Sequence, residues 1–464
     1  MIAKTLIINK LYGYLNKTID FNDKINLLVG INGSGKTSVL NIVNWILTPS
    51  LPHLCVTEFE SLELLFQYEN VEYLVKIKQD DKILTYNIKN ITSNITFHPL
   101  TVMLKIPTSR LTQNETQKER VYNEYVGLGP DKEETETWAF LFNQLPKPMV
   151  IGLDRYLFTE EKNELVIYTD EGMQRLITKD NASKASPLDE VRRLANREYS
   201  IYKNKIVDLN KVLNNKIMLS AFDEITQATV KELESVSNIS TEQVEALHRK
   251  VETFFKETMT DNKVKRQQKR PDNSFVKIEK YFNNLKKVIE EAETSKGKER
   301  YTFLYLSNIS QFKKLKEFIK EFEDFDRKSQ EYYASIKIYL DTINNFLIDS
   351  AKQLSFHKAL SELIFNVLDR DGKVVSKDRD IKTLSSGERQ VLILFTYLKF
   401  HNRTGTLFII DEPELSLHPK WQEDFLKAVE VLTPKNTQLI IATHSPIIVG
   451  NNKDYCKVLL PYNN

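Results

Sequence analysis

The stretch that decides the fold is GINGSGKT, from Gly30 to Thr37, where three of the chain's 13 glycines fall within six residues. It fits the phosphate-binding pattern G-x-x-x-x-G-K-S/T. The apolar run INLLVG (25–30) leads into it and is typical of a buried strand. Apolar residues spaced as on one helix face follow it, at Val39, Leu40, Val43, Ile46 and Leu47. Strand, glycine-rich turn and helix together are the setting in which this pattern binds a phosphate chain.

The residue types in this loop explain the chemistry that we expect of it. Glycines let the chain turn tightly, so that backbone N–H groups from Gly33 to Thr37 can surround a phosphate at the positive end of a helix. The Lys36 ammonium would reach the β- and γ-phosphates, and the Thr37 hydroxyl would bind Mg²⁺. The predicted nucleotide-binding residues of the loop are Asn32, Gly33, Ser34, Gly35, Lys36, Thr37 and Ser38.

Polar residues end two apolar runs near the other end of the chain. TLFIIDE (406–412) ends in Asp411 and Glu412, and TQLIIATHS (437–445) ends at His444 and its neighbours. A helix-length segment separates the runs, which favours parallel strands whose carboxyl ends share one ligand-binding edge of an α/β sheet. We expect Asp411 to bind Mg²⁺, Glu412 to take the proton of an attacking water, and His444 to contact a γ-phosphate. Taken singly, a solvated strand end and a structural histidine are the alternatives.

The segment LSSGERQ (384–390) is a second candidate phosphate site. It opens a helical pattern with apolar residues at Val391, Leu394, Phe395 and Leu398. Ser385 is a good N-cap, and backbone N–H groups around Gly387 would bind an anion at the helix N-terminus. Ser385, Gly387 and Glu388 therefore join the predicted nucleotide-binding residues; an ordinary helix start is the alternative.

Glycine is scarce in the middle of the chain, where Gly297 is the only one between Gly172 and Gly372, and this indicates long helices. Alternation from Val71 to Ile77, followed by ILTYNI (83–88), predicts a hairpin near the start. We predict an α/β fold whose two lobes, residues 1–183 and 351–464, come from the two ends of the chain. A mostly α-helical insertion, residues 184–350, separates them.

Composition narrows the class of protein. Hydrophobic residues make up 41% of the chain and charged residues 28%, as in ordinary globular proteins. The 65 Lys and Arg residues nearly cancel the 63 Asp and Glu residues, so net charge does not indicate a nucleic-acid or membrane partner. Two cysteines, Cys55 and Cys456, favour a reducing compartment. Since no leader peptide or membrane-length apolar run is evident, we expect a cytoplasmic protein with no membrane partner.

Together these four segments resemble the ATP-binding-cassette (ABC) ATPases, specifically the soluble branch with heads like those of structural-maintenance-of-chromosomes (SMC) proteins, RecF and Rad50. The resemblance covers about residues 1–110 and 355–460. It implies an ABC-type P-loop ATPase head, split in sequence, that binds ATP and Mg²⁺.

The same resemblance implies a partner. LSSGERQ corresponds to the family's signature loop, with Ser386 in place of the first glycine of the commonest form. It would contact ATP held by the Lys36 loop of a second copy, which implies a head-to-head dimer or a higher homo-oligomer. EPELSLHP (412–419) resembles the D-loop, with Ser416 and His418 near the seam between heads.

The sequences of the motifs look most like those of the compact ATPases of bacterial anti-phage systems, which are related to OLD-family heads. Septu-type or retron-associated ATPases are the first match and the PARIS ATPase the second. This implies an ATP-driven switch that controls a separate effector, with DNA or a phage-encoded product as the candidate trigger. Few residues follow His444, too few for the Toprim nuclease domain of OLD-family enzymes, so we expect a nuclease effector to be a separate polypeptide.

Two other functions remain open at this point. One is a DNA repair or maintenance ATPase, similar to RecF or Rad50, that acts directly on DNA. The basic segment KVKRQQKR (263–270) would contact phosphates in that case, although a solvated connector between helices is the alternative. The other is a transporter energy subunit, which is disfavoured because Lys36 and Leu384 lie so far apart in sequence.

Two smaller features are ambiguous. The family's Q-loop glutamine has three candidates, Gln67, Gln79 and Gln113. Asp369 and Asp371 form a D-x-D pair of the kind that binds metals, but Asp371 is followed by Gly372, a sequence that favours a hairpin turn.

Overall fold

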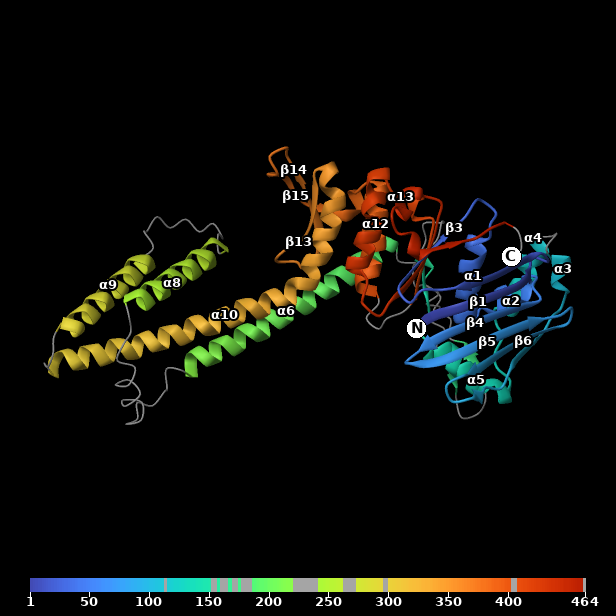
Figure 1. Cartoon of the computed structure of the whole chain (residues 1–464), viewed down its shortest axis with the longest axis horizontal. Coiled ribbons are helices and arrows are strands. Elements are labelled where there is room, and N and C mark those ends of the chain that lie inside the picture. The colour runs from blue at the N-terminus through green and yellow to red at the C-terminus, as the bar shows by residue number, and fades with distance from the viewer. Residues whose placement is uncertain are drawn as a thin grey trace. The chain divides into compact units, whose positions relative to one another are not determined.

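The computed structural model describes residues 1–111, 115–151, 157–158, 166–168, 174–176, 186–219, 241–261, 273–294, 299–401 and 407–461. The chain forms two compact units. The first contains Met1–Tyr199 and Ile336–Asn464, and the second contains Ser200–Ser335. The divisions fall within two long helices, α6 (Pro187–Leu219) and α10 (Glu299–Leu347) (Figure 1). The domain limits predicted from the sequence, at 183/184 and 350/351, stay a prediction.

An antiparallel sheet begins the first unit. Its strands are ordered β2-β1-β4-β5-β6-β7, and β8 also pairs with β6. The bounds are β1 (Ile2–Leu11), β2 (Leu15–Asp20), β4 (Ser61–Tyr68), β5 (Val71–Gln79), β6 (Ile83–Asn90), β7 (Ile95–Thr96) and β8 (Leu100–Met103). Buried and half-buried side chains alternate along β4 to β6, as expected when one face of a sheet covers a core. The predicted hairpin is the antiparallel pair β5–β6.

A mostly parallel sheet joins the two ends of the chain. Its order is β10-β9-β16-β17-β3-β18, with β10 antiparallel at the edge. The bounds are β3 (Ile25–Val29), β9 (Met149–Ile151), β10 (Leu157–Phe158), β16 (Leu407–Asp411), β17 (Gln438–Thr443) and β18 (Cys456–Val458). In this register Asp411 lies opposite Ala442, and Thr443 lies opposite Val29, so the three strands that carry predicted site residues end together. The predicted split α/β fold is confirmed.

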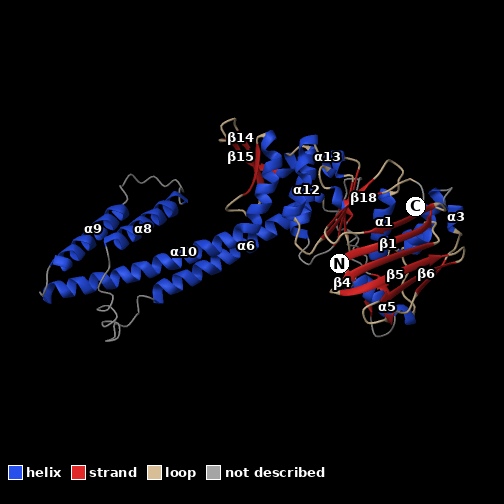
Figure 2. Cartoon of the chain, in the orientation of Figure 1, coloured by secondary structure: helices blue, strands red, loops and turns tan. Residues whose placement is uncertain are grey.

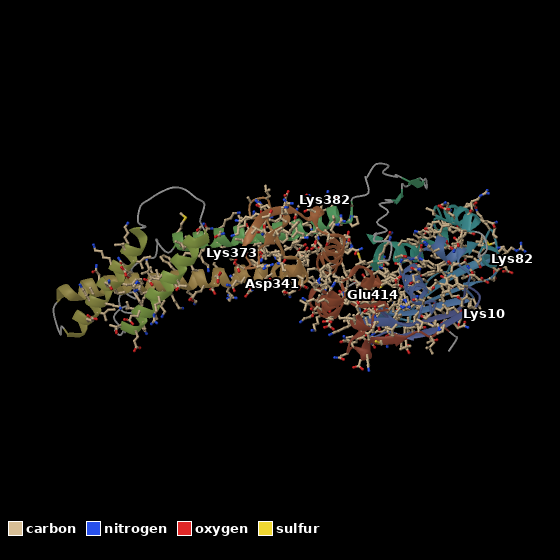
Figure 3. The ribbon with its side chains drawn as sticks, turned by 90° about the horizontal axis from the view of Figure 1, so that it is seen from above. Lys10, Lys82, Asp341, Lys373, Lys382 and Glu414 are labelled. Atoms are coloured by element: carbon tan, nitrogen blue, oxygen red, sulfur yellow. The ribbon has the colours of Figure 1, made fainter. Side chains whose placement is uncertain are left out.

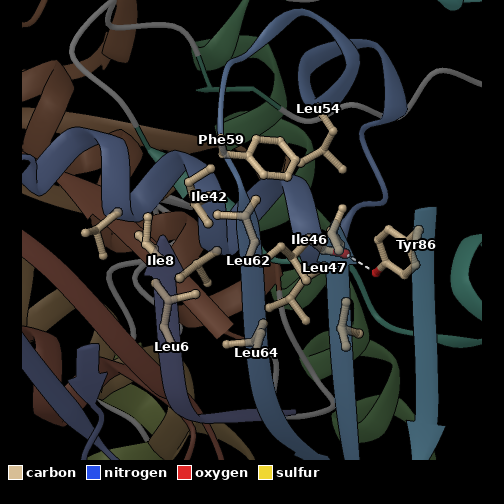
Figure 4. Close-up of a cluster of buried hydrophobic side chains, with 14 of the residues drawn as sticks. Leu6, Ile8, Ile42, Ile46, Leu47, Leu54, Phe59, Leu62, Leu64 and Tyr86 are labelled. Atoms are coloured by element: carbon tan, nitrogen blue, oxygen red, sulfur yellow. Dashed lines mark hydrogen bonds between the residues drawn. The ribbon is translucent and has the colours of Figure 1, made fainter. Parts of the chain in front are cut away.

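Helix α1 (Lys36–Leu47) packs in one hydrophobic core with residues from both sheets. Figure 4 shows Ile42, Ile46 and Leu47 of this helix beside Leu62 and Leu64 of β4. Burying each such Leu or Ile side chain contributes about 1.5–3 kcal/mol. The core therefore fixes the helix that begins directly after the glycine-rich loop.

Short helices and a small sheet complete the first unit. The helices are α2 (Leu51–Val56), α3 (Thr108–Leu111), α4 (Glu115–Tyr125), α5 (Thr135–Ala139), α11 (Ser386–Thr396), α12 (Pro419–Leu432) and α13 (Pro446–Val449). The small sheet contains β13 (Lys352–Phe356), β14 (Leu363–Leu368) and β15 (Val374–Asp380), and β11 (Val166–Tyr168) pairs with β12 (Gln174–Leu176). The β14–β15 turn confirms the hairpin, because Asp369 Oδ1 accepts from the backbone N–H groups of Asp371 and Lys373.

The second unit is helical where it is described, as the sequence predicts (Figure 2). It holds α8 (Thr241–Asp261), α9 (Asn273–Thr294) and the parts of α6 and α10 within its bounds. Its core consists of Val244, Leu247, Val251, Phe282, Leu285, Ile289, Phe312 and Ile319. The basic segment 263–270 lies outside the described residues. Over the part of the chain that is described, no helix combines the length and the apolarity needed to cross a bilayer.

Candidate functional site

A cleft of about 620 Å³ lies where β3, β16 and β17 end. Eight predicted residues line it: Asn32, Gly33, Gly35, Lys36, Thr37, Ser38, Glu412 and His444. Five further lining residues were not predicted: Tyr12, Tyr14, Leu15, Glu414 and Leu415. Among the described residues that line the cleft, none comes from 384–390. The structure thus brings the two ends of the chain to one cleft and leaves the second candidate phosphate site outside its lining.

Two glycines of the loop are needed for local steric reasons. Gly35 is the N-cap of α1 with a φ of 90°, and a Cβ there would lie 2.9 Å from Leu15 Cδ2. A Cβ on Gly30 would lie 2.4 Å from the Leu459 carbonyl oxygen, in the segment that follows β18. Neither position accepts a side chain without moving its neighbours. The loop is therefore packed between the start of β2 and the segment after β18.

Lys36 lies over its own loop. Its Nζ donates to the carbonyl oxygens of Gly30, at 3.0 Å, and Ile31, at 3.2 Å. Burial lowers the pKa of Lys36, while the carboxylates of Glu412, Asp411 and Glu414 oppose that shift. The residue is 5% exposed, so this ammonium is a positioned donor with few competing waters.

Thr37 lines the cleft and contacts Asp411, which is not part of the described lining. The Thr37 hydroxyl bonds to the Asp411 carboxylate. Asp411 Oδ1 is buried and has no hydrogen-bond partner among the described residues. Burial raises the pKa of Asp411, the charges of Glu412 and Glu414 add to the rise, and Thr37 and Lys36 oppose it. A hydroxyl beside an unpaired carboxylate oxygen, in surroundings short of positive charge, is a donor set that fits Mg²⁺.

Glu412 and His444 form a pair at the ends of adjacent strands. Glu412 Oε1 lies 3.5 Å from His444 Nε2. Glu412 has a φ of 46°, and its backbone N–H donates to the Ala442 carbonyl at 2.9 Å. A positive φ at a residue other than glycine carries strain that the surroundings must hold, and such strain gathers at functional sites. The geometry places a carboxylate and an imidazole side by side in the lining of the cleft.

Glu414 is a functional candidate that sequence reasoning missed (Figure 3). Its Oε2 accepts from the Thr443 hydroxyl at 2.8 Å, and its Oε1 accepts from the backbone N–H of His444. The available signal was a third carboxylate two residues after Glu412. Its partners, Thr443 and His444, lie at the end of β17, far from Glu414 in sequence, so the sequence alone did not indicate them.

Tyr12 and Tyr14 were also missed. They occupy the turn between β1 and β2, line the cleft, and are 38% and 63% exposed. Two aromatic rings flanking a glycine, as YGY, were the available signal. Exposed rings beside a phosphate loop offer flat apolar surfaces on which a nucleobase can stack.

The segment 384–390 forms a capped helix start, as predicted. Ser385 caps α11: its Oγ accepts from the Glu388 backbone N–H at 3.4 Å, and Glu388 Oε2 accepts from the Ser385 backbone N–H at 2.7 Å. Ser385 and Ser386 are exposed and Gly387 is half-buried. Glu388 is buried and pairs with Lys352. The nucleotide contacts of Ser385, Gly387 and Glu388 stay a prediction, and for Glu388 the structure shows partners that hold the loop in place.

The structure describes some of the remaining sequence candidates and leaves others out. Gln79 accepts from Thr108 Oγ1 at 2.9 Å and donates to the Leu54 carbonyl at 3.0 Å, and Gln67 lies on β4. Gln113 is outside the described residues, as is the side chain of Ser416. His418 is exposed and caps α12. The position of the Q-loop glutamine stays open.

Comparisons with known proteins identify the family of the chain. A family model described as AAA ATPase domain matches residues 1–449. The retron Vc95 probable ATPase of Vibrio cholerae serotype O1 biovar El Tor is 30% identical over 126 residues, which is 26% of this chain and 23% of that protein. The retron Ec83 probable ATPase of Escherichia coli is 28% identical over 149 residues, 27% of each chain. This chain thus spans about a quarter of the length of these curated relatives.

Solved structures were also matched. The Smc head domain derived from Pyrococcus furiosus aligns over 97% of this chain and 91% of that chain, with 12% identity and a TM-score of 0.33. The SMC head domain from Thermotoga maritima aligns over the same shares, with 10% identity and a TM-score of 0.33.

Proposed function

This chain belongs to the AAA ATPase domain family, whose model spans nearly all of it, and we propose that the cleft binds ATP with Mg²⁺ and hydrolyses the ATP. The observation that carries the proposal is the meeting of four groups from both chain ends: Lys36, Asp411, Glu412 and His444. A phosphate loop, a carboxylate with one buried and unpaired oxygen, and a carboxylate–imidazole pair are parts that can serve phosphoryl transfer to water.

Each residue has a role in this proposal. The loop N–H groups and Lys36 bind the phosphate chain, with Lys36 exchanging the carbonyls of Gly30 and Ile31 for phosphate oxygens. Thr37 and Asp411 would hold Mg²⁺, which neutralises phosphate charge when it is bound. Glu412 takes the proton of the attacking water.

Groups around the cleft orient the reactants. His444, beside Glu412, orients the water against the terminal phosphate. Tyr12 and Tyr14 stack on the base.

We further propose that a second copy of the chain completes the site. Ser385 and Ser386 are exposed at the N-terminus of α11, and residues 384–390 do not contribute to the described lining of the cleft. A helix N-terminus with free N–H groups binds anions. In a head-to-head pair, this segment of one copy would cover the phosphates held by Lys36 of the other, so that assembly depends on ATP.

We propose that this chain acts in the cytoplasm as an ATPase of a bacterial anti-phage defence system. It would control a separate effector protein, for which a nuclease is the first candidate. Two matched relatives bear the description of retron probable ATPases, which supports this choice. The sequences of the phosphate loop, LSSGERQ and EPELSLHP, which resemble those of anti-phage ATPases, support the same choice. Direct action on DNA, in the manner of RecF or Rad50, is the competing function.

Two variants test the hydrolysis proposal. Glu412→Gln removes the base while keeping size and shape, so we expect turnover to fall by about 10²- to 10⁴-fold with ATP binding retained and ATP-dependent dimers accumulating. Lys36→Ala should lose ATP binding, because a buried ammonium is removed from the phosphate chain. Titration calorimetry, phosphate release and light scattering measure these quantities. Wild-type turnover in Glu412→Gln would show that another residue is the base.

Purification from a native host separates the two cellular functions. The full chain should co-purify with a nuclease, and the ratio of the two should depend on whether ATP or ADP is present. ATPase activity that DNA stimulates with a steep salt dependence, with no second protein bound, would instead favour direct action on DNA.

A further inference from the structure

A closed ring of hydrogen bonds includes Glu414 of the cleft lining and the two sequence neighbours of His444, Thr443 and Ser445. The Thr443 hydroxyl donates to Glu414 Oε2 at 2.8 Å and accepts from the Ser445 backbone N–H at 3.0 Å. Ser445 Oγ donates to Gln422 Oε1 at 2.6 Å. Gln422 Nε2 donates to the backbone carbonyl of Glu414 at 3.4 Å, which closes the ring. We call Glu414, Gln422, Thr443 and Ser445 the polar ring.

Three members of the polar ring are buried, whereas Glu414 is half-buried and lines the cleft; the polar atoms that form the ring are paired. Thr443 is 1% exposed, Ser445 7% and Gln422 9%. Gln422 Nε2 makes a second bond, to the Leu417 carbonyl at 3.0 Å. Hydrogen bonds among buried polar groups fix the geometry of these groups, because a broken bond at Thr443, Ser445 or Gln422 would leave an unsatisfied group away from water. The ring is therefore a rigid connection between the segments that carry it.

The ring joins three segments, which are the end of β17, the turn after β16 and helix α12 with Gln422, and the proposed reaction needs to coordinate the first two. One is the end of β17, where Glu414 Oε1 accepts from the His444 backbone N–H and so fixes the residue beside Glu412. The other is the turn after β16, which contains a 3₁₀ helix from Pro413 to Ser416 and ends at Leu417. The backbone carbonyls of Glu414 and Leu417 accept hydrogen bonds from Gln422. Leu415 in this turn lines the cleft and is 65% exposed.

We propose that the polar ring couples His444 to the turn 413–417, so that the position of the imidazole at the terminal phosphate and the position of the turn change together. Glu414 and Gln422 are positioning residues in this inference, which rests on the proposed function. Gln422 is absent from the described lining of the cleft and acts through Glu414 and Ser445. In a pair of heads, the turn presents Leu415 to the second copy, so ATP in the cleft and contact with that copy would support each other.

A purely structural role predicts something different. A buried glutamine that only holds the fold together would lower stability when replaced, and turnover per folded molecule would not change. The chain contains a matched example in Gln438, at the start of β17, which is fully buried. Its side chain bonds to both backbone groups of Ala3 and to the Asn22 carbonyl, with distances of 2.7–2.8 Å.

The experiment compares Gln422→Met with Gln438→Met in the full-length chain. Both replacements keep the length of the side chain and remove three hydrogen bonds of a buried amide. We expect Gln422→Met to lower kcat by about 10- to 100-fold, since small misplacements of reacting groups cost that much. At protein concentrations too low for self-association, its Kd for ATP should stay within about twofold of wild type, because the loop that binds the phosphates is untouched. ATP-dependent self-association should weaken in parallel. Gln438→Met should keep kcat while losing comparable thermal stability.

Thr443→Val is the second variant, because it preserves shape on a strand and breaks only the Glu414 and Ser445 bonds of the ring. It should reproduce the fall in kcat even if Gln422→Met folds poorly. Wild-type kcat and self-association in Thr443→Val would overturn the coupling. The outcome is separable from the proposed function: if the wild-type chain does not hydrolyse ATP, the proposed function fails, whereas an active wild type with unaffected ring variants removes only this inference.

Discussion

The half-buried Lys352 ammonium forms an ion pair with the buried Glu388 carboxylate, with Nζ 2.7 Å from Oε2 and 2.9 Å from Oε1. Lys352 is the first residue of β13, just after the short helix that follows α10, and Glu388 lies in the first turn of α11. The same carboxylate accepts the Ser385 N–H. The pair therefore fixes the loop that we propose to present to a second copy, using a residue on another element.

Replacing this lysine should destabilise the protein and loosen the loop. Lys352→Met leaves a carboxylate, 4% exposed, without its cation, which should cost about 3 kcal/mol at neutral pH. Urea denaturation measures the loss. ATP-dependent self-association should weaken more than ATP binding, since the cleft that holds the phosphates keeps its residues. Lys352→Arg, which keeps the charge, is the control. Equal weakening of binding and association would argue against this role.

The pH dependence of that loss has a definite sign. Burial would raise the pKa of Glu388, but Lys352 and the Ser385 N–H outweigh it and hold the pKa below its usual range. A depressed carboxyl pKa contributes stability that is present above the unfolded value, about 4.3, and is lost as pH falls through the folded value. The stability difference between wild type and Lys352→Met should therefore shrink in acid. A constant difference would mean that the charge of Glu388 does not contribute to it.

Replacing Asp411, unlike replacing Lys352, should make the folded protein more stable while it removes a functional group. Burial and two neighbouring carboxylates raise its pKa, so its charged form is held at a cost in the folded protein. In EDTA, Asp411→Asn should raise the melting temperature and increase the free energy of unfolding by about 1 kcal/mol, because it removes a partly buried negative charge beside two other carboxylates. It should also abolish the stabilisation that Mg²⁺ with ATP gives to wild type. A lower melting temperature in EDTA would contradict the predicted repulsion.

Sequence patterns predicted the parts of the site that are local. The loop at Gly30–Thr37, the capped helix after Leu384 and the polar ends of the strands at Asp411 and His444 each appear within a few residues, where periodicity and turn chemistry act. Adjacency in the parallel sheet then followed from strand–helix–strand spacing.

The missed residues depend on contacts between segments that are distant in sequence. Glu414 has its partners on β17, and Lys352 has its partner in α11. Tyr12 reaches the cleft only because β2 packs against the loop through Leu15. A local sequence pattern does not indicate contacts between distant segments. In the sequence alone, Glu414 in EPE and Lys352 at the start of a strand therefore look like ordinary solvated residues.

The first glycine of the loop tests how the loop is packed. Gly30→Ala would place a Cβ 2.4 Å from the Leu459 carbonyl oxygen and 2.6 Å from Ser34 Oγ, so the loop or the segment after β18 must move. We expect ATP affinity to fall by about 10-fold or more, as displaced N–H groups lose the phosphates. Gly372→Ala is the matched control, because its φ of +76° imposes strain in open space within the β14–β15 turn. If Gly30→Ala binds ATP as tightly as wild type, the segment after β18 can move aside at little energetic cost.

The far end of the loop's helix offers a test of whether stability and binding can be separated. Tyr86 of β6 is fully buried, and its hydroxyl donates to the Ile46 carbonyl at 2.8 Å (Figure 4). Ile46 lies in the last turn of α1, where carbonyls lack partners within the helix. Tyr86→Phe keeps the ring and leaves that carbonyl unpaired, so the free energy of unfolding should fall by about 1–2 kcal/mol. The Kd for ATP should stay unchanged, because the hydrophobic face of α1 still fixes the helix. A weaker Kd in this variant would mean instead that the Tyr86 bond sets the position of α1, and with it the geometry of Lys36 and Thr37.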